Sequence, residues 1–178
     1  MTDPIVHLVL AAALSLLFAH AAWHKWRSGV RFEAQLAEYR LLPNVMVPFA
    51  ARGLTGIEAL VAVALLWPLS RQPAALAAAL LFATYAAAIG INLLRGRHHI
   101  DCGCGDSPVL LSRWLVGRNL LLMAGALLLT WPAAPRTPVT LDLVFGLFGL
   151  CALVLTWLLL EQLLANASVL REWRESRE

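Results

Sequence analysis

The sequence predicts an all-α integral membrane protein, a single-domain bundle of four to five transmembrane helices. Of its 178 residues, 60% are hydrophobic and only 14% are charged. A soluble domain of this length is about half apolar and about a quarter charged. Such an apolar excess is typical of a chain whose solvent is lipid. The sequence shows no strand pattern, internal repeat or nucleic-acid-binding motif, so the lipid bilayer is an expected partner and nucleic acid is not.

Five apolar runs have roughly the length of about 20 residues that a membrane-crossing helix needs. They cover about residues 5–23, 53–69, 74–94, 111–131 and 139–160, and a charged tail follows over residues 161–178. A short interfacial helix is predicted over residues 32–42. For the first run a cleavable signal peptide is the alternative. Signal peptides begin with basic residues, whereas the first Lys or Arg here is Lys25, which favours a retained helix.

The lysine and arginine residues fall mostly on one side of this alternating arrangement. Arg71 and Arg136 lie on one side, and the other twelve of the fourteen Lys and Arg residues lie on the opposite side. Because basic residues mark the cytoplasmic face, we expect a multi-pass protein of the bacterial inner membrane with its N-terminus outside and its C-terminus in the cytoplasm. The loop between the third and fourth spans then faces the cytoplasm.

Several polar side chains are expected to gather at one end of the bundle, beneath that loop. Glu58 and Arg118 lie near the starts of their spans, and His24 and Asn92 lie near the ends of theirs. Because successive spans alternate in direction, all four are expected on the same side of the membrane. A charge within hydrocarbon usually faces the bundle interior and is paired. Glu58 and Arg118 are therefore expected to form an ion pair. A purely structural contact between helices, or extension of Arg118 to the interface, is the alternative.

The loop between the third and fourth spans contains Cys102 and Cys104, separated only by a glycine. Two thiols this close can form a small, strained disulfide, and strain makes such a bond readily reducible. Arg95, Arg97 and Arg118 are near in the sequence or at the same end of the bundle, and cations favour the nucleophilic thiolate. A redox-active cysteine pair is the interpretation that these residues favour.

Metal binding is the main alternative for this loop, and a structural or inert loop is another. His98, His99, Cys102 and Cys104 supply four nitrogen and sulfur ligands that suit zinc or copper, although their spacing is not that of the usual zinc site. Cys151, in the last apolar run, is expected to be a small buried hydrophobe, with a relay of electrons across the bilayer as its alternative role. The sequence indicates no certain cofactor and leaves a bound quinone open.

In their order along the chain, these residues resemble the MauE family of methylamine utilisation proteins, which belongs with the DoxX-like membrane proteins. The resemblance covers about residues 5–131 and rests on His24-Lys25, the run 39–43, Glu58, Asn92, Arg95-Gly96, the run 101–105 and Arg118-Asn119. The Cys-Gly-Cys-Gly block followed by Arg-Asn is its most specific part. The family often has an aromatic residue and a further glycine after the second cysteine, where this chain has Asp106 and Ser107.

The resemblance implies a function in the maturation of an exported protein, the small subunit of methylamine dehydrogenase, which is periplasmic and rich in disulfides. It also implies a thioredoxin-like partner similar to MauD. The alternative is that the chain is a non-catalytic scaffold that anchors this partner. Cys102 and Cys104 are implied as the catalytic thiols. The implied supporting polar residues are His24, Lys25, Glu58, Asn92, Arg95, Arg118 and Asn119.

The implied client and the charge pattern point to opposite faces of the membrane. A periplasmic client is served most simply from outside, whereas the basic residues place the cysteine loop in the cytoplasm. Either electrons cross the bilayer, or this fold departs from the charge rule.

The orientation can be tested with fused reporters. A reporter after Glu178 is expected to report the cytoplasm and one after Arg136 the outside, because basic residues are retained on the cytoplasmic face. Enzymatic reporters that are active on only one side of the membrane provide the measurement. The reverse pattern would move the cysteine loop to the periplasm.

Overall fold

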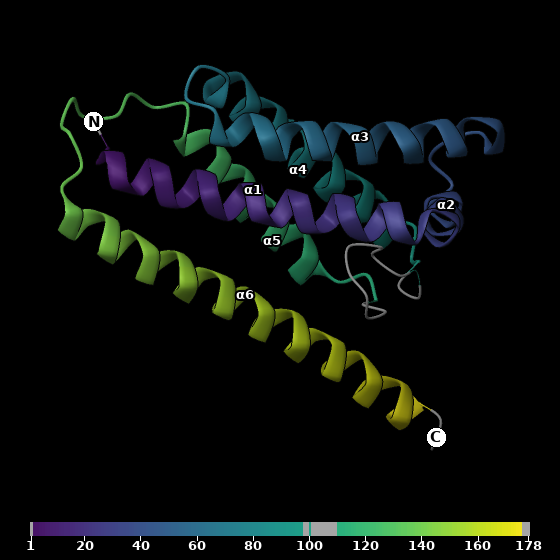
Figure 1. Ribbon diagram of the computed structural model, residues 1–178. Coiled ribbons are helices and arrows are strands. Elements are labelled where there is room, and N and C mark those ends of the chain that lie inside the picture. Colours follow the sequence, from purple (N-terminus) through teal and green to yellow (C-terminus); the bar gives the residue numbers. More distant parts are fainter. Residues whose placement is uncertain (1, 98–99, 101–109, 176–178) are drawn as a thin grey trace.

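The computed structural model describes residues 2–97, 100 and 110–175, and this part of the chain folds into helices (Figure 1). An isolated bridge joins Thr2 and Ala133. The elements are α1 (Pro4–Arg27), α2 (Gly29–Glu38), the short 3-10 helix η1 (Asn44–Met46), α3 (Val47–Leu66), α4 (Arg71–Leu94), α5 (Arg113–Leu128) and α6 (Thr140–Glu175). The predicted all-α class is confirmed.

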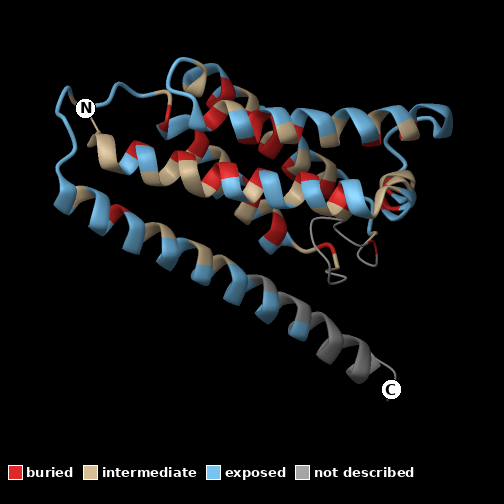
Figure 2. Cartoon of the chain, viewed as in Figure 1, coloured by how far each residue is buried: buried red, intermediate tan, exposed pale blue. Residues whose placement is uncertain are grey.

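Within the described residues, four helical segments are long and apolar enough to cross a membrane. They are Pro4–Arg27, Asn44–Leu66, Arg71–Leu94 and Thr140–Leu160. The fourth predicted span, which the structure forms as α5, has only 16 helical residues, or about 24 Å, which is less than the hydrocarbon core of about 30 Å. Figure 2 shows exposed residues along the outward faces of the helices. Many of these residues are large and apolar, as Leu60, Leu121 and Phe148 illustrate. Such a surface suits lipid rather than water, and the chain is a multi-pass membrane protein.

The helices extend beyond the predicted apolar runs. α1 continues to Arg27, α3 begins at Val47, and α6 continues through most of the charged tail. The short interfacial helix is present as α2. Hydropathy marks only the part of a helix that lipid surrounds, and the backbone hydrogen bonds continue where charged side chains are solvated. Pro48 does not interrupt α3, because it lies in the first turn, where no N–H is needed.

Helices α1, α3, α4 and α5 pack around a common core, and α6 lies along the outside of α1 (Figure 1). The core is rich in alanine from α4, and the rings of Phe18 and Phe82 approach to 4.9 Å between centroids. Small residues let membrane helices approach closely. The C-terminal ends of α1 and α4 and the N-terminal ends of α3 and α5 lie at the same end of the bundle, which we call the polar end.

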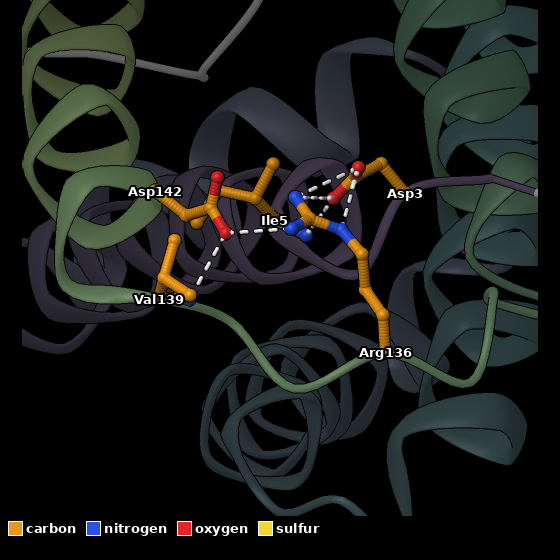
Figure 3. A network of polar contacts seen from close by, with 5 residues as sticks. All are labelled: Asp3, Ile5, Arg136, Val139 and Asp142. Carbon is orange, nitrogen blue, oxygen red and sulfur yellow. Dashed lines mark hydrogen bonds and ion pairs between the residues drawn. The ribbon is translucent and has the colours of Figure 1, made fainter.

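A network at the opposite end fixes the start of α6 (Figure 3). Arg136 bonds through Nη2 to Oδ2 of Asp3 at 3.0 Å and through Nη1 to Oδ2 of Asp142 at 2.9 Å. Asp3 also caps α1 by accepting from the backbone N–H of Ile5. The hydrogen bonds to Asp142 and then to Asp3 raise the pKa of Arg136 above its ordinary value. Because Asp3 precedes α1 and Asp142 lies in the first turn of α6, Arg136 ties the starts of these two helices together.

One glycine sets how closely α6 approaches α1. A Cβ atom on Gly146 would lie 2.8 Å from Cδ1 of Ile5 and 3.3 Å from Cγ2 of Val9. A Cβ on Gly149, on the next turn of α6, would meet no atom within 4 Å. Close packing between α1 and α6 therefore depends on Gly146 and not on Gly149.

We expect Gly146→Leu to lower the free energy of unfolding by about 1–3 kcal/mol, because the new side chain overpacks the contact with α1. Gly149→Leu is the matched control and is expected to stay within about 0.5 kcal/mol. Unfolding in mixed detergent micelles gives both values. Equal losses in the two variants would show that α6 does not pack on α1 through Gly146.

Candidate functional site

An ion pair is buried between α1, α3 and α4. Lys25 donates from Nζ to Oε1 of Glu58, and the hydroxyl of Tyr85 donates to the same oxygen at 2.5 Å. Lys25 also lies 3.3 Å from the hydroxyl of Tyr85 and 4.9 Å from the ring centroid of Phe32. Only 4% of Lys25 and 1% of Glu58 is exposed. Removing two charges from solvent is tolerated when they are paired and hydrogen-bonded, and Lys25 and the Oε1 atom of Glu58 meet that requirement.

The predicted ion pair between Glu58 and Arg118 is wrong. The structure pairs Glu58 with Lys25 instead, and the second carboxylate oxygen of Glu58, Oε2, is buried and has no hydrogen-bond partner in the described structure. The guanidinium of Arg118 lies over the ring of Trp157 of α6, 4.9 Å from its centroid. Residue number along a helix predicts the depth of each charge, but depth does not decide which helix lies beside it.

A cavity of about 400 Å³ extends from this cluster along the bundle. Lys25, Glu58, Tyr85, Arg118 and Asn119 contribute to its lining near the polar end. Leucine, alanine, valine and aromatic side chains of α1, α4, α5 and α6 form the rest of its wall. Glu58 and Arg118 thus face one cavity although they do not form an ion pair with each other.

Two buried asparagines lie near the polar end. Asn92 of α4 is fully buried and Asn119 of α5 is 3% exposed. Each side-chain amide donates to a carbonyl one turn earlier in its own helix, to Ala88 at 3.0 Å and to Leu115 at 2.8 Å. The side-chain oxygen of Asn92 is buried and, among the described residues, accepts no hydrogen bond. Buried polar atoms are nearly always satisfied, so this oxygen is an acceptor available to a further group.

The two ends of the cysteine loop are held together. The backbone N–H of Leu111 donates to the carbonyl of Ile100 at 3.1 Å, and both side chains are buried in a cluster with Tyr39, Ile89 and Leu115. Gly96 ends α4 with a positive φ of 72°, a backbone conformation that glycine adopts without strain. The loop therefore leaves and rejoins the bundle at the polar end.

The predicted thiol pair, Cys102 and Cys104, lies outside the described residues, as do His98 and His99 of the alternative metal site. Both the redox and the metal interpretations therefore stay predictions. Cys151 is described, and it is exposed on α6 rather than buried.

The arginines that precede the cysteines contact the last residue of α2 and the segment that follows it. Arg95 donates to the carbonyl of Arg40 at 3.4 Å, and Arg97 donates to the carbonyl of Glu38 at 3.1 Å. Cations at a helix C-terminus satisfy its last carbonyls and its dipole. These two side chains thus hold α2 against the end of α4. His24, also predicted as a supporting residue, is half-buried on α1 next to Lys25.

Neither Tyr85 nor Trp157 was identified from the sequence as a residue of the site. Tyr85 is the only tyrosine in the alanine-rich third run and lies two helical turns before Asn92. That spacing places both residues on one face of α4, so the sequence contained a pattern from which Tyr85 could have been predicted to lie on the same face as Asn92. Trp157 lies among apolar residues of the last predicted span, a position typical of a packing or lipid contact, and nothing in its local sequence connects it with Arg118.

These features define a multi-pass helical membrane protein with a buried Lys–Glu–Tyr cluster beside a cavity at one end of its bundle. Residues 3–132 match the family described as methylamine utilisation protein MauE, and the chain belongs to this family. It is 40% identical to the methylamine utilization protein MauE of Paracoccus denitrificans, over 79% of this chain and 77% of that relative. It is 37% identical to the protein of the same name from Methylorubrum extorquens, over 87% and 86%. No solved structure matches.

We expect Glu58→Gln and Lys25→Gln each to lower the free energy of unfolding by about 3–5 kcal/mol, because each change leaves a buried partner uncompensated. The double variant is expected to lose less than the sum of the two. Unfolding in mixed detergent micelles measures all three.

The pair Arg52 and Glu33 is the control. Its atoms Nε and Oε1 are 3.9 Å apart and the Arg52 side chain is 77% exposed. Removing an exposed pair changes stability by about 1 kcal/mol or less. Strictly additive losses at Lys25 and Glu58 would show that the two side chains do not interact.

Proposed function

We propose that this chain is a thiol-disulfide redox protein of the bacterial inner membrane that assists disulfide formation in an exported protein. Cys102 and Cys104 are its proposed redox pair. Its relatives are named for methylamine utilisation. We therefore propose the small subunit of methylamine dehydrogenase as the client and a thioredoxin-like protein similar to MauD as the partner.

The observation that carries this proposal is that both ends of the cysteine loop lie at the end of the bundle that contains the buried cluster. The loop with both cysteines leaves and rejoins the bundle at Ile100 and Leu111, which are hydrogen-bonded to each other. The same end of the bundle contains the ion pair of Lys25 and Glu58 and the guanidinium of Arg118. Charged groups are expensive inside a membrane and usually mark a functional site. Their location at the end of the bundle where the loop with two closely spaced cysteines is attached supports a redox site there.

The proposed reaction proceeds through a mixed disulfide. A thiolate of the chain attacks a sulfur of the partner disulfide, a new S–S bond forms, and the partner's leaving thiolate takes up a proton. The second cysteine then attacks the mixed disulfide and releases the partner as a dithiol. We propose Cys104 as the attacking thiol, because it is nearer in the chain to α5, whose N-terminal amides favour a thiolate. Cys102 then resolves the complex, and the reverse sequence transfers a disulfide to the partner.

The distribution of basic residues supports a cytoplasmic polar end. Lys25, Arg52, Arg95 and Arg113 lie at or near this end, whereas Arg71 and Arg136 lie at the opposite one. With that orientation, the electrons removed from an exported client have to cross part of the bilayer.

Trapping a mixed disulfide tests this function. Cys102→Ser removes the proposed resolving thiol, so a covalent complex with a thioredoxin-like protein is expected to accumulate, as seen by non-reducing electrophoresis and mass spectrometry. The complex is expected to disappear on reduction and in the Cys102→Ser, Cys104→Ser double variant. Cys151→Ser is the control and leaves it intact.

Two results would replace the proposal. Zinc or copper that is retained by the purified chain and lost in the double variant would favour a metal-binding module. Retained function in the double variant would favour a scaffold that positions the thioredoxin-like protein without turnover.

A further inference from the structure

We propose that the cavity between α1, α4, α5 and α6 binds a lipid-soluble quinone, with its head group at Lys25, Glu58 and Arg118 and its apolar tail along the rest of the wall. This inference rests on the proposed thiol chemistry and identifies the class of its electron acceptor. The residues that carry this inference are all described in the structure.

The cavity has the size and polarity that such a ligand needs. Its volume of about 400 Å³ lies within the range of about 300–1,000 Å³ that is usual for small-molecule sites. Along α1 its lining extends from Leu10 to Lys25, which is about 22 Å of helix. The charged lining side chains lie at the Lys25 end, His20 lies about one and a half turns of α1 before Lys25, and apolar residues line most of the rest. An elongated site that is polar at one end matches a ring with oxygen substituents and a long apolar tail.

The hydrogen-bonding groups at the polar end favour a quinone over a phospholipid. Oε2 of Glu58 is buried and has no hydrogen-bond partner among the described residues, so it can accept from the hydroxyl of a hydroquinone. Lys25 has three N–H donors and is bonded to Glu58 and Tyr85, which leaves one for a quinone carbonyl. A phosphate offers acceptors only, and the carboxylate oxygen of Glu58 repels it. Donor and acceptor side by side therefore suit both redox forms of a quinone.

The position of α6 gives the cavity a side that faces lipid. Close contact with α1 occurs near the start of α6, where Gly146 meets Ile5 and Val9. Toward its C-terminal end α6 diverges from α1 (Figure 1). Val154 and Trp157 of α6 contribute to the cavity wall in that diverging part. Only α6 therefore separates this side of the cavity from the bilayer, and a ligand dissolved in lipid enters beside α6.

The proposed reaction balances in atoms and electrons. Transfer of the disulfide from the proposed redox pair to the thioredoxin-like partner leaves both cysteines of the pair as thiols. Quinone takes two electrons and two protons from this dithiol, one S–S bond forms, and both quinone carbonyls become hydroxyls. The hydroquinone then leaves through lipid and carries the electrons away from the chain.

Binding of decylubiquinone to the purified chain in lipid nanodiscs tests the site. Leu122→Trp fills the cavity from α5, whereas Leu121→Trp adds the same bulk at a side chain that is 74% exposed. We expect Leu122→Trp to weaken binding at least about tenfold and Leu121→Trp to leave it unchanged. If Leu122→Trp does not fold, Val154→Trp takes its place, with Leu155→Trp, 60% exposed, as its control.

The outcomes separate the site from the chemistry. Equal binding by the cavity variant and its control, or occupation of the cavity by phospholipid that decylubiquinone does not displace, would overturn the quinone site. No quinone binding together with a trapped mixed disulfide would also overturn it and leave the exchange function in place. Quinone bound in the cavity beside thiols that never reduce it would retain the binding site and reject the exchange function. Stoichiometric reduction of decylubiquinone with oxidation of the two thiols would support both.

Discussion

The ion pair of Lys25 and Glu58 is the constraint on which the architecture of the polar end depends. Neither charge is stable alone in a low-dielectric interior, and the pair forms only if α1 and α3 meet at matching depth. Tyr85 adds α4 to the same contact by donating to Oε1 of Glu58 at 2.5 Å. One carboxylate oxygen therefore fixes three helices relative to one another, at the same end of the bundle where the cysteine loop begins and ends.

The cavity follows from the contrast between a tightly packed core and a loosely attached last helix. Alanine residues of α4 allow close packing in the core, whereas α6 is held at its start by Arg136 and by the packing of Gly146 on α1. Beyond these contacts α6 diverges, and the space that it leaves extends to the buried ion pair. The same arrangement thus places a polar group that needs a donor at the end of an apolar, ligand-sized space.

The sequence allowed good prediction of everything that depends on distance along the chain. The apolar runs located the helices, and the order of the spans placed Lys25, Glu58 and Arg118 at one end of the bundle. The motifs also indicated the family, which the match over residues 3–132 confirms. The bounds of the helices were less well predicted, because a helix continues after its side chains leave the lipid.

The sequence by itself therefore determined the fold class, the family and the end of the bundle at which polar residues gather. Only the tertiary structure decided that Glu58 pairs with Lys25, that Tyr85 joins them and that Arg118 faces Trp157 across a cavity. Helical rise converts residue number into depth at a fixed rate, so depth can be calculated from sequence. Lateral neighbours depend on how whole helices rotate and pack against one another, and no local pattern of residues encodes that choice.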